Sequence, residues 1–246
     1  MSLALEAAGV RLFAYSVLGS TNDEARRLAE LRESGPLAVW AAEQPRGRGR
    51  AGRTWAGTRG NLMTSLLLYP DRGPSEAGSM ALVAGLAVAD CAQEWGQDAR
   101  IKWPNDVLVD DAKLAGVLVE AGLKGGQLDW MVVGIGLNLA EAPALNHPTA
   151  CVGADVPVEA ALERVAEAVL RRYRQWLAGG FASVRDEWLE RAAWLGRAVR
   201  VGDGHRVVEG LMRTVDTDGS LVVCDKAGVE RRLIAGEMFP LEVRCC

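Results

Sequence analysis

The segment Gln44-Pro-Arg-Gly-Arg-Gly-Arg-Ala-Gly-Arg-Thr-Trp55 alternates glycine with arginine and offers almost no apolar side chain for packing. Its four guanidinium groups lie within eight residues, at Arg46, Arg48, Arg50 and Arg53. Glycines between them, which allow close approach of the backbone, are Gly47, Gly49 and Gly52. Because backbone N–H groups and arginines can enclose phosphate or carboxylate oxygens, we expect a loop that is mobile alone and ordered by an anionic ligand.

Strands are predicted on both sides of this loop, at residues 37–42 and 61–69. Upstream, an alternating segment at residues 10–18 predicts a strand, and Thr21 with Glu24 has capping-box spacing at the start of a helix. That helix carries Ala25, Leu28, Ala29 and Leu31 on one face. The following elements are a helix at 79–95, a hairpin of 100–109 with 113–120, a strand at 130–137 and helices at 157–176 and 181–195. This order predicts an α+β domain.

The last fifty residues differ from the rest, because they predict only short strands, at 198–201, 206–215, 220–224 and 229–233. Turn signals separate these strands at Asp203-Gly204, Asp218-Gly219 and Ala227-Gly228. The pattern indicates a small β-barrel after the larger domain, with a boundary near Trp194. We therefore expect domains at 1–194 and 195–246.

Composition excludes several classes of protein. The 246 residues are 49% hydrophobic and 24% charged, which is ordinary for a globular protein and excludes disorder and coiled coil. The net charge of −4 argues against a surface that binds nucleic acid throughout. The densest apolar stretch, Ala81–Ala89, is shorter than the ~18 residues of a membrane span, and no secretory signal is visible, so we expect a cytoplasmic location.

Cysteine and histidine offer little chemistry. The five cysteines are odd in number and form no C-x-x-C motif, which argues against a disulfide framework or a zinc site; two of them, Cys245 and Cys246, end the sequence. Only His147 and His205 could supply imidazole, and we expect both to be bystanders.

Two further motifs carry polar groups at the ends of predicted strands. Lys102-Trp-Pro-Asn-Asp106 has a proline that stops strand pairing, and Lys113-Leu-Ala-Gly116 on the return strand brings a second cation close. Gly134-Ile-Gly-Leu-Asn138 lacks the third glycine of a dinucleotide fingerprint, and no Walker A pattern is present. Ser20-Thr21-Asn22 fits a helix cap, which still leaves its hydroxyl and N–H groups available to a polar ligand.

Taken in this order, the motifs from Ser20 to Asn138 resemble those of the biotin–protein ligase family. The resemblance implies a mixed sheet with helices followed by a small SH3-like barrel. It also implies an enzyme that makes biotinyl-5′-AMP from biotin and ATP with Mg²⁺, and then transfers biotin to a lysine. The implied partner is the biotin carboxyl carrier protein of acetyl-CoA carboxylase, with no specific nucleic acid and no membrane. Because dimers are common in the family, the resemblance is also compatible with a homodimer.

The resemblance also implies roles for individual residues. The biotin-binding set is Ser20, Thr21, Asn22, Gln44, Arg48, Gly49, Arg50 and Lys102, of which Lys102, Arg48 and Arg50 are catalytic. The nucleotide-binding set is Arg53, Trp55, Asn105, Lys113, Gly116 and Asn138, and Asn138 also serves Mg²⁺. These roles agree with the chemistry, because attack of a carboxylate on an α-phosphate joins two anions and requires cations to stabilise the charge.

Two other interpretations remain open from the sequence. A lipoate or octanoyl ligase shares the implied fold and acyl transfer, although the tight Gly/Arg loop favours biotin. An RNA-binding module could use the same loop. The net negative charge and the lack of interleaved aromatic residues argue against this interpretation. Because the first strand begins near Val10, we also expect the type without an N-terminal DNA-binding domain.

Overall fold

The computed structural model describes residue 5 and residues 9–153, 155–202 and 206–241. Four features expected from the sequence lie outside these residues: the Asp203-Gly204 turn, His205, Cys245 and Cys246.

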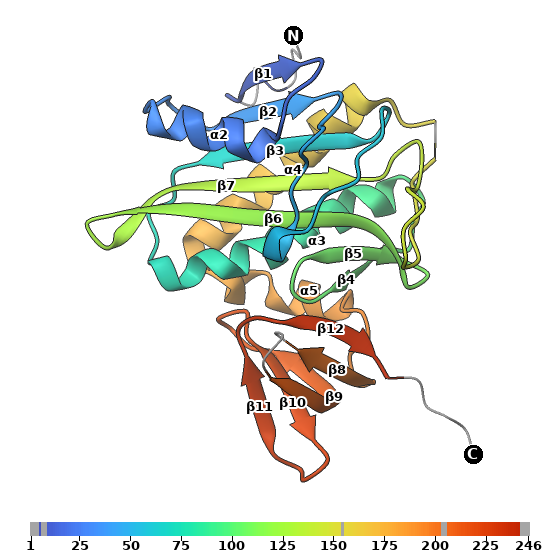
Figure 1. The fold of residues 1–246 in the computed structure, drawn as a ribbon. Coiled ribbons are helices and arrows are strands. Elements are labelled where there is room, and N and C mark those ends of the chain that lie inside the picture. The colour runs from blue at the N-terminus through green and yellow to red at the C-terminus, as the bar shows by residue number, and fades with distance from the viewer. Residues whose placement is uncertain (1–4, 6–8, 154, 203–205, 242–246) are drawn as a thin grey trace.

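The larger part of the molecule is built on a seven-stranded sheet (Figure 1). Its strands are β1 (Arg11–Tyr15), β2 (Leu37–Ala41), β3 (Leu62–Leu68), β4 (Arg100–Lys102), β5 (Asp106–Val109), β6 (Ala112–Lys124) and β7 (Gln127–Leu137). They lie in the order β1-β2-β3-β7-β6-β5-β4. The β1–β2 pair is parallel and the other pairs are antiparallel, so the sheet is mixed, as predicted.

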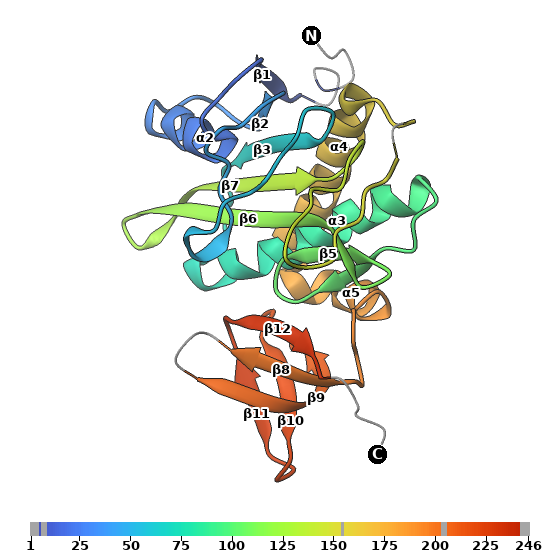
Figure 2. The same ribbon diagram turned by 45° about the vertical axis from the view of Figure 1, so that its right-hand side comes forward.

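Helices cover both faces of this sheet because the strands alternate between two apolar sides. On one face, α2 (Thr21–Glu30) packs against Val39, Leu67 and Val132. On the other, α3 (Met80–Glu94) and α4 (Val158–Gly179) pack together against the neighbouring positions of the same strands, such as Leu66 and Val133. Figures 1 and 2 show the helices α3 and α4 side by side on that face. The face that carries α2 is only partly covered, which leaves room for a site beside it.

The helix α3 continues from a short 3-10 turn, η2 (Pro74–Ser79). Together they form a segment, Pro74–Glu94, that is long and apolar enough to cross a membrane by length and composition alone. However, 72% of this window is buried inside the protein, as is usual for the core helix of a globular domain.

A second, antiparallel sheet of five strands follows in the chain (Figure 2). Its strands are β8 (Ala198–Gly202), β9 (Val207–Val215), β10 (Leu221–Asp225), β11 (Glu230–Leu233) and β12 (Glu237–Pro240). Gly219 and Gly228 have positive φ in the turns predicted for them. The strand β12 was not predicted, and it pairs with β8 at the edge nearer to the first sheet. The two sheets and their helices confirm the α+β fold class.

The structure corrects three local expectations. Ser20 is the N-cap of α2 and no side chain caps it; instead of closing a capping box, Glu24 accepts hydrogen bonds from Arg27 and Tyr15. Leu31 is 61% exposed because α2 ends at Glu30. The helix expected at 181–195 is a 3-10 turn, η3 (Phe181–Ser183), and one short helix, α5 (Arg185–Glu190).

Candidate functional site

One cavity lies on the face of the seven-stranded sheet that α2 leaves uncovered. With one exception, it is lined by every site residue predicted from the sequence: Ser20, Thr21, Asn22, Gln44, Arg48, Gly49, Arg50, Arg53, Trp55, Asn105, Lys113, Gly116 and Asn138. The exception is Lys102. Predicted site residues from five separate segments of the chain therefore meet at one place.

The strand β7 forms the floor of this cavity through alternate residues. Val132 packs under α2, Gly134 lies under Asn22, and Gly136 lies under the indole of Trp55. A Cβ atom at either glycine would overlap the side chain above it. The strand β6 repeats this arrangement, because Gly116 is the register partner of Gly136 and also contacts Trp55. The glycines thus provide space for side chains that lie flat on the sheet.

At the α2 end, a chain of polar contacts holds the Ser20-Thr21-Asn22 segment. The backbone N–H of Thr21 donates to Gln44 Oε1 at 2.6 Å. The buried Ser65 Oγ donates to Asn22 Oδ1 at 2.6 Å and lies 2.7 Å from Thr21 Oγ1. Asn22 Nδ2 in turn donates to Glu120 Oε2 at 2.8 Å. The fixed amides and hydroxyls suit a neutral ligand with several donors and acceptors.

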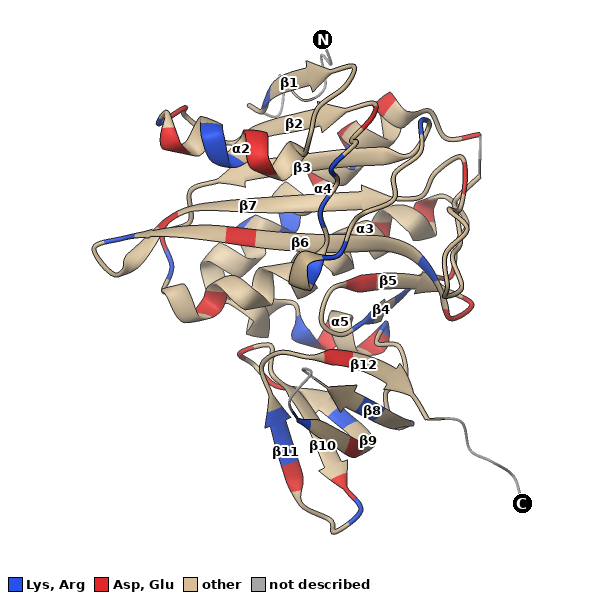
Figure 3. Ribbon diagram, in the orientation of Figure 1, with Lys and Arg blue, Asp and Glu red and all other residues tan. Residues whose placement is uncertain are grey.

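The Gly/Arg loop, residues 44–55, crosses β6 and β7, and Figure 3 shows its basic segments over these strands. Arg48 pairs with Asp23 at 2.6 Å and with Glu120. Arg50 Nη1 donates to Asn105 Oδ1 at 2.9 Å and Nη2 to the carbonyl of Gly236 at 3.3 Å, while Arg53 pairs with Glu237 at 2.6 Å. The loop expected to be ordered only by a ligand is therefore held here by contacts to α2, β6 and the second sheet.

The two lysines of the predicted motifs share one carboxylate. Asp106 lies 2.6 Å from Lys113 Nζ and 3.4 Å from Lys102 Nζ. Lys113 lines the cavity beside Trp55, with its Nζ 5.6 Å from the ring centroid. Lys102 instead has its Nζ 5.1 Å from the ring of Phe239 in β12 and 5.8 Å from that of Trp194. Cation–π attraction and Asp106 thus hold Lys102 beside the cavity and not in it.

The Trp55 end of the cavity is less polar. Its wall includes Pro143, Leu145, His147 and Thr149, from a segment tied to β6 by hydrogen bonds from Lys113 N to Pro148 O and from Ala150 N to Lys113 O, both at 2.9 Å. His147, expected to be a bystander, lies on this wall. An apolar slot closed by an indole suits a flat aromatic ring.

Asn138 is buried at this end and has a defined orientation. Its Nδ2 donates to the carbonyls of Ala150 at 2.9 Å and Lys113 at 3.3 Å, and because carbonyls only accept, the amide cannot be flipped. Its Oδ1 has no hydrogen-bond partner within the described part of the chain. A buried acceptor without a partner costs free energy, so this atom is available for a donor on a ligand.

Charge further defines what the cavity can bind. Four cations line it, Arg48, Arg50, Arg53 and Lys113, whereas no Asp or Glu is among the described residues of its wall. Burial lowers the pKa of Arg50, which shows that part of this charge is desolvated. A half-enclosed cavity lined by cations, with a polar end and an aromatic end, suits a ligand that carries a negative charge between a polar ring system and a flat base.

Sequence reasoning missed Asp23, Ser65, Glu120 and Asp106. Ser65 lies in a largely apolar strand and Glu120 inside β6, and neither belongs to a glycine-rich or proline-rich motif. The available signal was weak: Ser65 follows another polar residue, Thr64, and Glu120 follows the apolar run 117–119.

Comparisons with known proteins agree on one family. The "Biotin/lipoate A/B protein ligase family" matches residues 15–138, and the "Biotin protein ligase C terminal domain" matches residues 194–239. A biotin–[acetyl-CoA-carboxylase] ligase of Paracoccus denitrificans is 39% identical over 234 residues, which cover 89% of this chain and 96% of the relative. The bifunctional ligase/repressor BirA of Escherichia coli is 33% identical over 235 residues, covering 90% and 71% respectively.

The fold has solved counterparts. The biotin protein ligase from Aquifex aeolicus in complex with biotin and ATP superimposes with a TM-score of 0.79 at 24% identity, covering 94% of this chain and 99% of that one. At that identity the similarity shows the fold alone.

Proposed function

Because this chain belongs to the biotin–protein ligase family, we propose a role for each part of the cavity and a protein substrate for the reaction. The enzyme is a biotin ligase that uses ATP to activate biotin as biotinyl-5′-AMP and transfers biotin to a lysine of a protein. The lipoate ligase and the RNA-binding module are not favoured. The observation that carries the assignment of residues is that motifs spread over 120 positions meet in one positively charged cavity.

The α2 end of the cavity would hold the biotin ring system. Thr21, Asn22 and Gln44 are fixed by the contacts described above, and they present amide and hydroxyl groups to the ureido ring. The Trp55 end would hold adenine between the indole and the apolar wall, with Asn138 Oδ1 accepting a hydrogen bond from the nucleotide. The carboxylate of biotin and the α-phosphate would then meet under Arg48 and Arg50.

Activation joins these two anions. A carboxylate oxygen forms a bond to the α-phosphorus, the bond to the bridging oxygen breaks, and its electron pair leaves with pyrophosphate. Arg50, Arg53 and Lys113 would stabilise the accumulating charge, because cations in a partly desolvated site act more strongly than in water. During this step the ammonium group of Lys102 would leave Asp106 and the Phe239 ring and contact the phosphate.

The cavity does not fit a resident Mg²⁺. Protein-bound Mg²⁺ uses one or two carboxylates together with substrate phosphates, and no carboxylate is among the described residues of the cavity wall. Asn138 Oδ1 is a single amide oxygen, so we assign Asn138 to the nucleotide alone. Mg²⁺ would enter as part of the ATP substrate.

Transfer requires the loop to protect the intermediate. An acyl-adenylate is readily hydrolysed, and a loop that covers it excludes water until the lysine arrives. In the second step the lysine nitrogen attacks the biotinyl carbonyl carbon, and the carbon–oxygen bond to phosphate breaks. The electron pair leaves with AMP, and the protons of the lysine pass to AMP and solvent.

We propose that the acceptor is the lysine of a biotin carboxyl carrier protein of acetyl-CoA carboxylase and that the reaction occurs in the cytoplasm, where ATP is available. The relative from Paracoccus denitrificans is a biotin–[acetyl-CoA-carboxylase] ligase, which supports this acceptor. The division of the strands into two sheets supports a domain boundary near Trp194.

The test is incubation of the protein with biotin, ATP, Mg²⁺ and an isolated carrier domain, followed by mass measurement. We expect the mass of one biotin on one lysine, and no product when lipoate replaces biotin. An unmodified carrier in the presence of biotin, at micromolar enzyme, would rule out the proposed acceptor.

A further inference from the structure

Glu120 lies where the Gly/Arg loop meets the α2 end of the cavity, and no motif of the sequence includes it. It belongs to β6, and its side chain is 23% exposed. It also lines a second cavity, formed by the loop residues Arg48–Arg53 together with Leu118. Of the described residues that line either cavity, Glu120 is the one acidic residue.

Each carboxylate oxygen of Glu120 contacts a different part of the site. Oε2 accepts a hydrogen bond from Asn22 Nδ2 at 2.8 Å, and Oε1 pairs with the guanidinium of Arg48. The amide of Asn22 is itself oriented by Ser65, which donates to its Oδ1. One side chain therefore connects a residue of the biotin end to the loop that covers the cavity.

Asp23 provides a second carboxylate that pairs with Arg48. It follows Asn22 in α2 and lies 2.6 Å from Arg48 Nη1. The two carboxylates hold one guanidinium from two elements, so they anchor the Arg48 part of the loop to α2 and β6. We call Asp23 and Glu120 the Arg48 clamp.

We propose that Glu120 is a positioning residue that acts through Arg48: it holds the Gly/Arg loop over the cavity, and its hydrogen bond to Asn22 keeps it in place. The proposal rests on the function proposed above, because the loop has a task only if it retains biotinyl-AMP. The carboxylate takes no part in bond making. Its effect is on the fraction of time that the loop is closed.

The first experiment needs no substrate. Limited trypsin digestion of the ligand-free protein reports opening of the loop through cleavage after Arg48, Arg50 and Arg53. In Glu120→Gln we expect cleavage within the loop to become about five- to tenfold faster. The variant loses an ion pair and a charged hydrogen bond, and this loss should raise the population of the open loop by about the same factor. Arg48→Gln breaks the same pair from the loop side and also removes one of the cleavage sites, so it must give a similar increase at the two remaining sites, Arg50 and Arg53.

The matched control is Asp129→Asn. Asp129 is another acid that pairs with an arginine, Arg32 at 2.8 Å, with a similar exposure of 20%, but it lies outside both cavities. Loop cleavage in this variant should equal that of the unaltered protein. Equal rates in the Glu120→Gln and unaltered proteins would overturn the proposal, as would a general loss of protection over the whole chain.

The second experiment is a double-mutant cycle on the dissociation rate of pre-formed biotinyl-AMP. Glu120→Gln should release it about five- to tenfold faster, and in an Arg48→Gln background the same change should have little further effect. Additive effects would show that Glu120 does not act through Arg48. If the unaltered protein forms no biotinyl-AMP, the proposed function fails, while the trypsin result still decides whether the clamp holds the loop.

Discussion

Single residues shape the two ends of the cavity, and two glycines in β7 show this most clearly. Gly134 and Gly136 are two positions apart, so they share one face of the sheet, and each accommodates a different side chain, Asn22 or Trp55. A methyl group at either position must displace the residue above it. The same small change is therefore expected to have different consequences.

We predict that Gly134→Ala raises the KM for biotin and that Gly136→Ala raises the KM for ATP. Overpacking costs about 1–3 kcal/mol, which corresponds to roughly 5- to 150-fold in each case. Steady-state kinetics with each substrate varied in turn measure both effects. Gly78→Ala is the control, since no atom lies within 4 Å of its added Cβ. If the same KM rose in both variants, the proposed division of the cavity into a biotin end and an ATP end would be wrong.

Arg50 has a larger structural role than its place in a glycine-rich loop predicts. A glycine-rich loop without apolar side chains predicts that substitution of Arg48 or Arg50 leaves stability almost unchanged. The structure supports this for the exposed Arg48 but not for Arg50, which is half-buried and donates to Asn105 and to the carbonyl of Gly236.

We predict that Arg50→Gly both destabilises the protein and releases biotinyl-AMP sooner. Loss of a charge-assisted hydrogen bond costs about 1.5–3 kcal/mol, or roughly ten- to a hundredfold in the dissociation rate. The measurements are a thermal melt without ligand and the off-rate of pre-formed biotinyl-AMP. The control is Arg59→Gly. Arg59 lies in the same segment between β2 and β3, but its side chain is 69% exposed, so this variant should change neither the melting temperature nor the off-rate. An unchanged off-rate in Arg50→Gly would exclude a role in retention.

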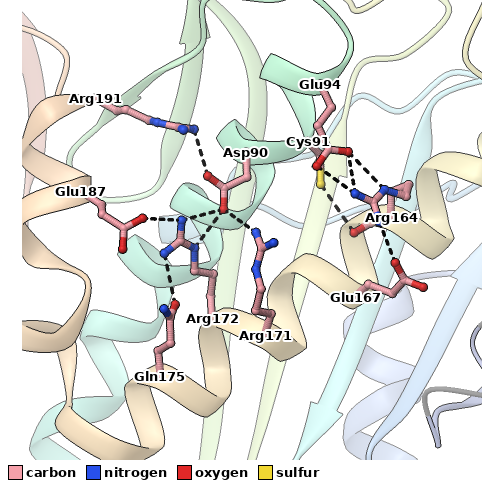
Figure 4. A network of polar contacts seen from close by, with 10 residues as sticks. All are labelled: Asp90, Cys91, Glu94, Arg164, Glu167, Arg171, Arg172, Gln175, Glu187 and Arg191. Carbon is pink, nitrogen blue, oxygen red and sulfur yellow. Dashed lines mark hydrogen bonds and ion pairs between the residues drawn. The ribbon is translucent and has the colours of Figure 1, made fainter.

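At the scale of elements, the helices behind the sheet are joined by a buried charge network (Figure 4). Asp90 in α3 pairs with Arg171 and Arg172 of α4 at 2.9 Å and with Arg191, just after α5, at 3.0 Å. The side chains of Asp90 and Arg172 are only 9% and 7% exposed. This carboxylate therefore fixes three segments relative to each other on the face opposite the cavity.

We predict that Asp90→Asn lowers the free energy of unfolding by about 3–5 kcal/mol, because it leaves the buried guanidinium of Arg172 without one of its two carboxylate partners and removes the partner of Arg171 and Arg191. Urea denaturation measures the change. Glu94→Gln is a matched control in the same helix: Glu94 pairs with Arg164, but both side chains are almost half exposed, so the cost should stay below about 1 kcal/mol. Equal costs in the two variants would show that burial does not decide the strength of these pairs.

At the scale of the whole molecule, contacts between the two parts of the chain bring β12 and the turn before β10 to the Lys102 motif and the Gly/Arg loop. Trp103 Nε1 donates to the carbonyl of Gly219 at 3.1 Å, and Arg53 reaches Glu237. Phe239 contacts Lys102 in the same region. The second sheet therefore supports both the Lys102 motif and the Gly/Arg loop.

Acid should weaken the whole molecule, because carboxyl groups in separate parts of it have lowered pKa values. The hydrogen bond from Arg27 lowers the pKa of Glu24 in α2, that from Arg172 lowers the pKa of Glu187 in α5, and the backbone N–H of Val229 lowers the pKa of Asp225 in β10. In each case the folded pKa lies below the ordinary value of 4.5 for Glu or 3.8 for Asp. The unfolded chain therefore binds protons first as the pH falls.

We predict that the stabilisation from these groups is complete above about pH 5 and is lost as the pH falls through their folded pKa values. Urea denaturation at a series of pH values from about 6 to 3 should show a steady decrease of the midpoint in the acid range. The decrease should be smaller in Glu187→Gln, which lacks one of the groups. A midpoint that rises in acid would contradict the direction of these shifts.

The sequence by itself determined the elements and the chemical character of the site. Apolar periodicity located most strands and helices of the first domain and the turns of the second, because side-chain alternation follows directly from local backbone geometry. The motifs at Ser20, Gln44–Trp55, Lys113 and Asn138 were recognisable because glycine, proline and charged residues stand out where a strand ends.

Only the tertiary structure decided which side chains meet. That Ser65 lies opposite Gly134 and Glu120 opposite Val132 follows from the register of β3, β6 and β7, and periodicity specifies the face of a strand but not its register with another. For the same reason Lys102, placed in the site by its motif, lies beside Phe239 of a sheet more than a hundred residues away. Contacts between distant segments depend on packing of the whole chain, and no local pattern encodes them.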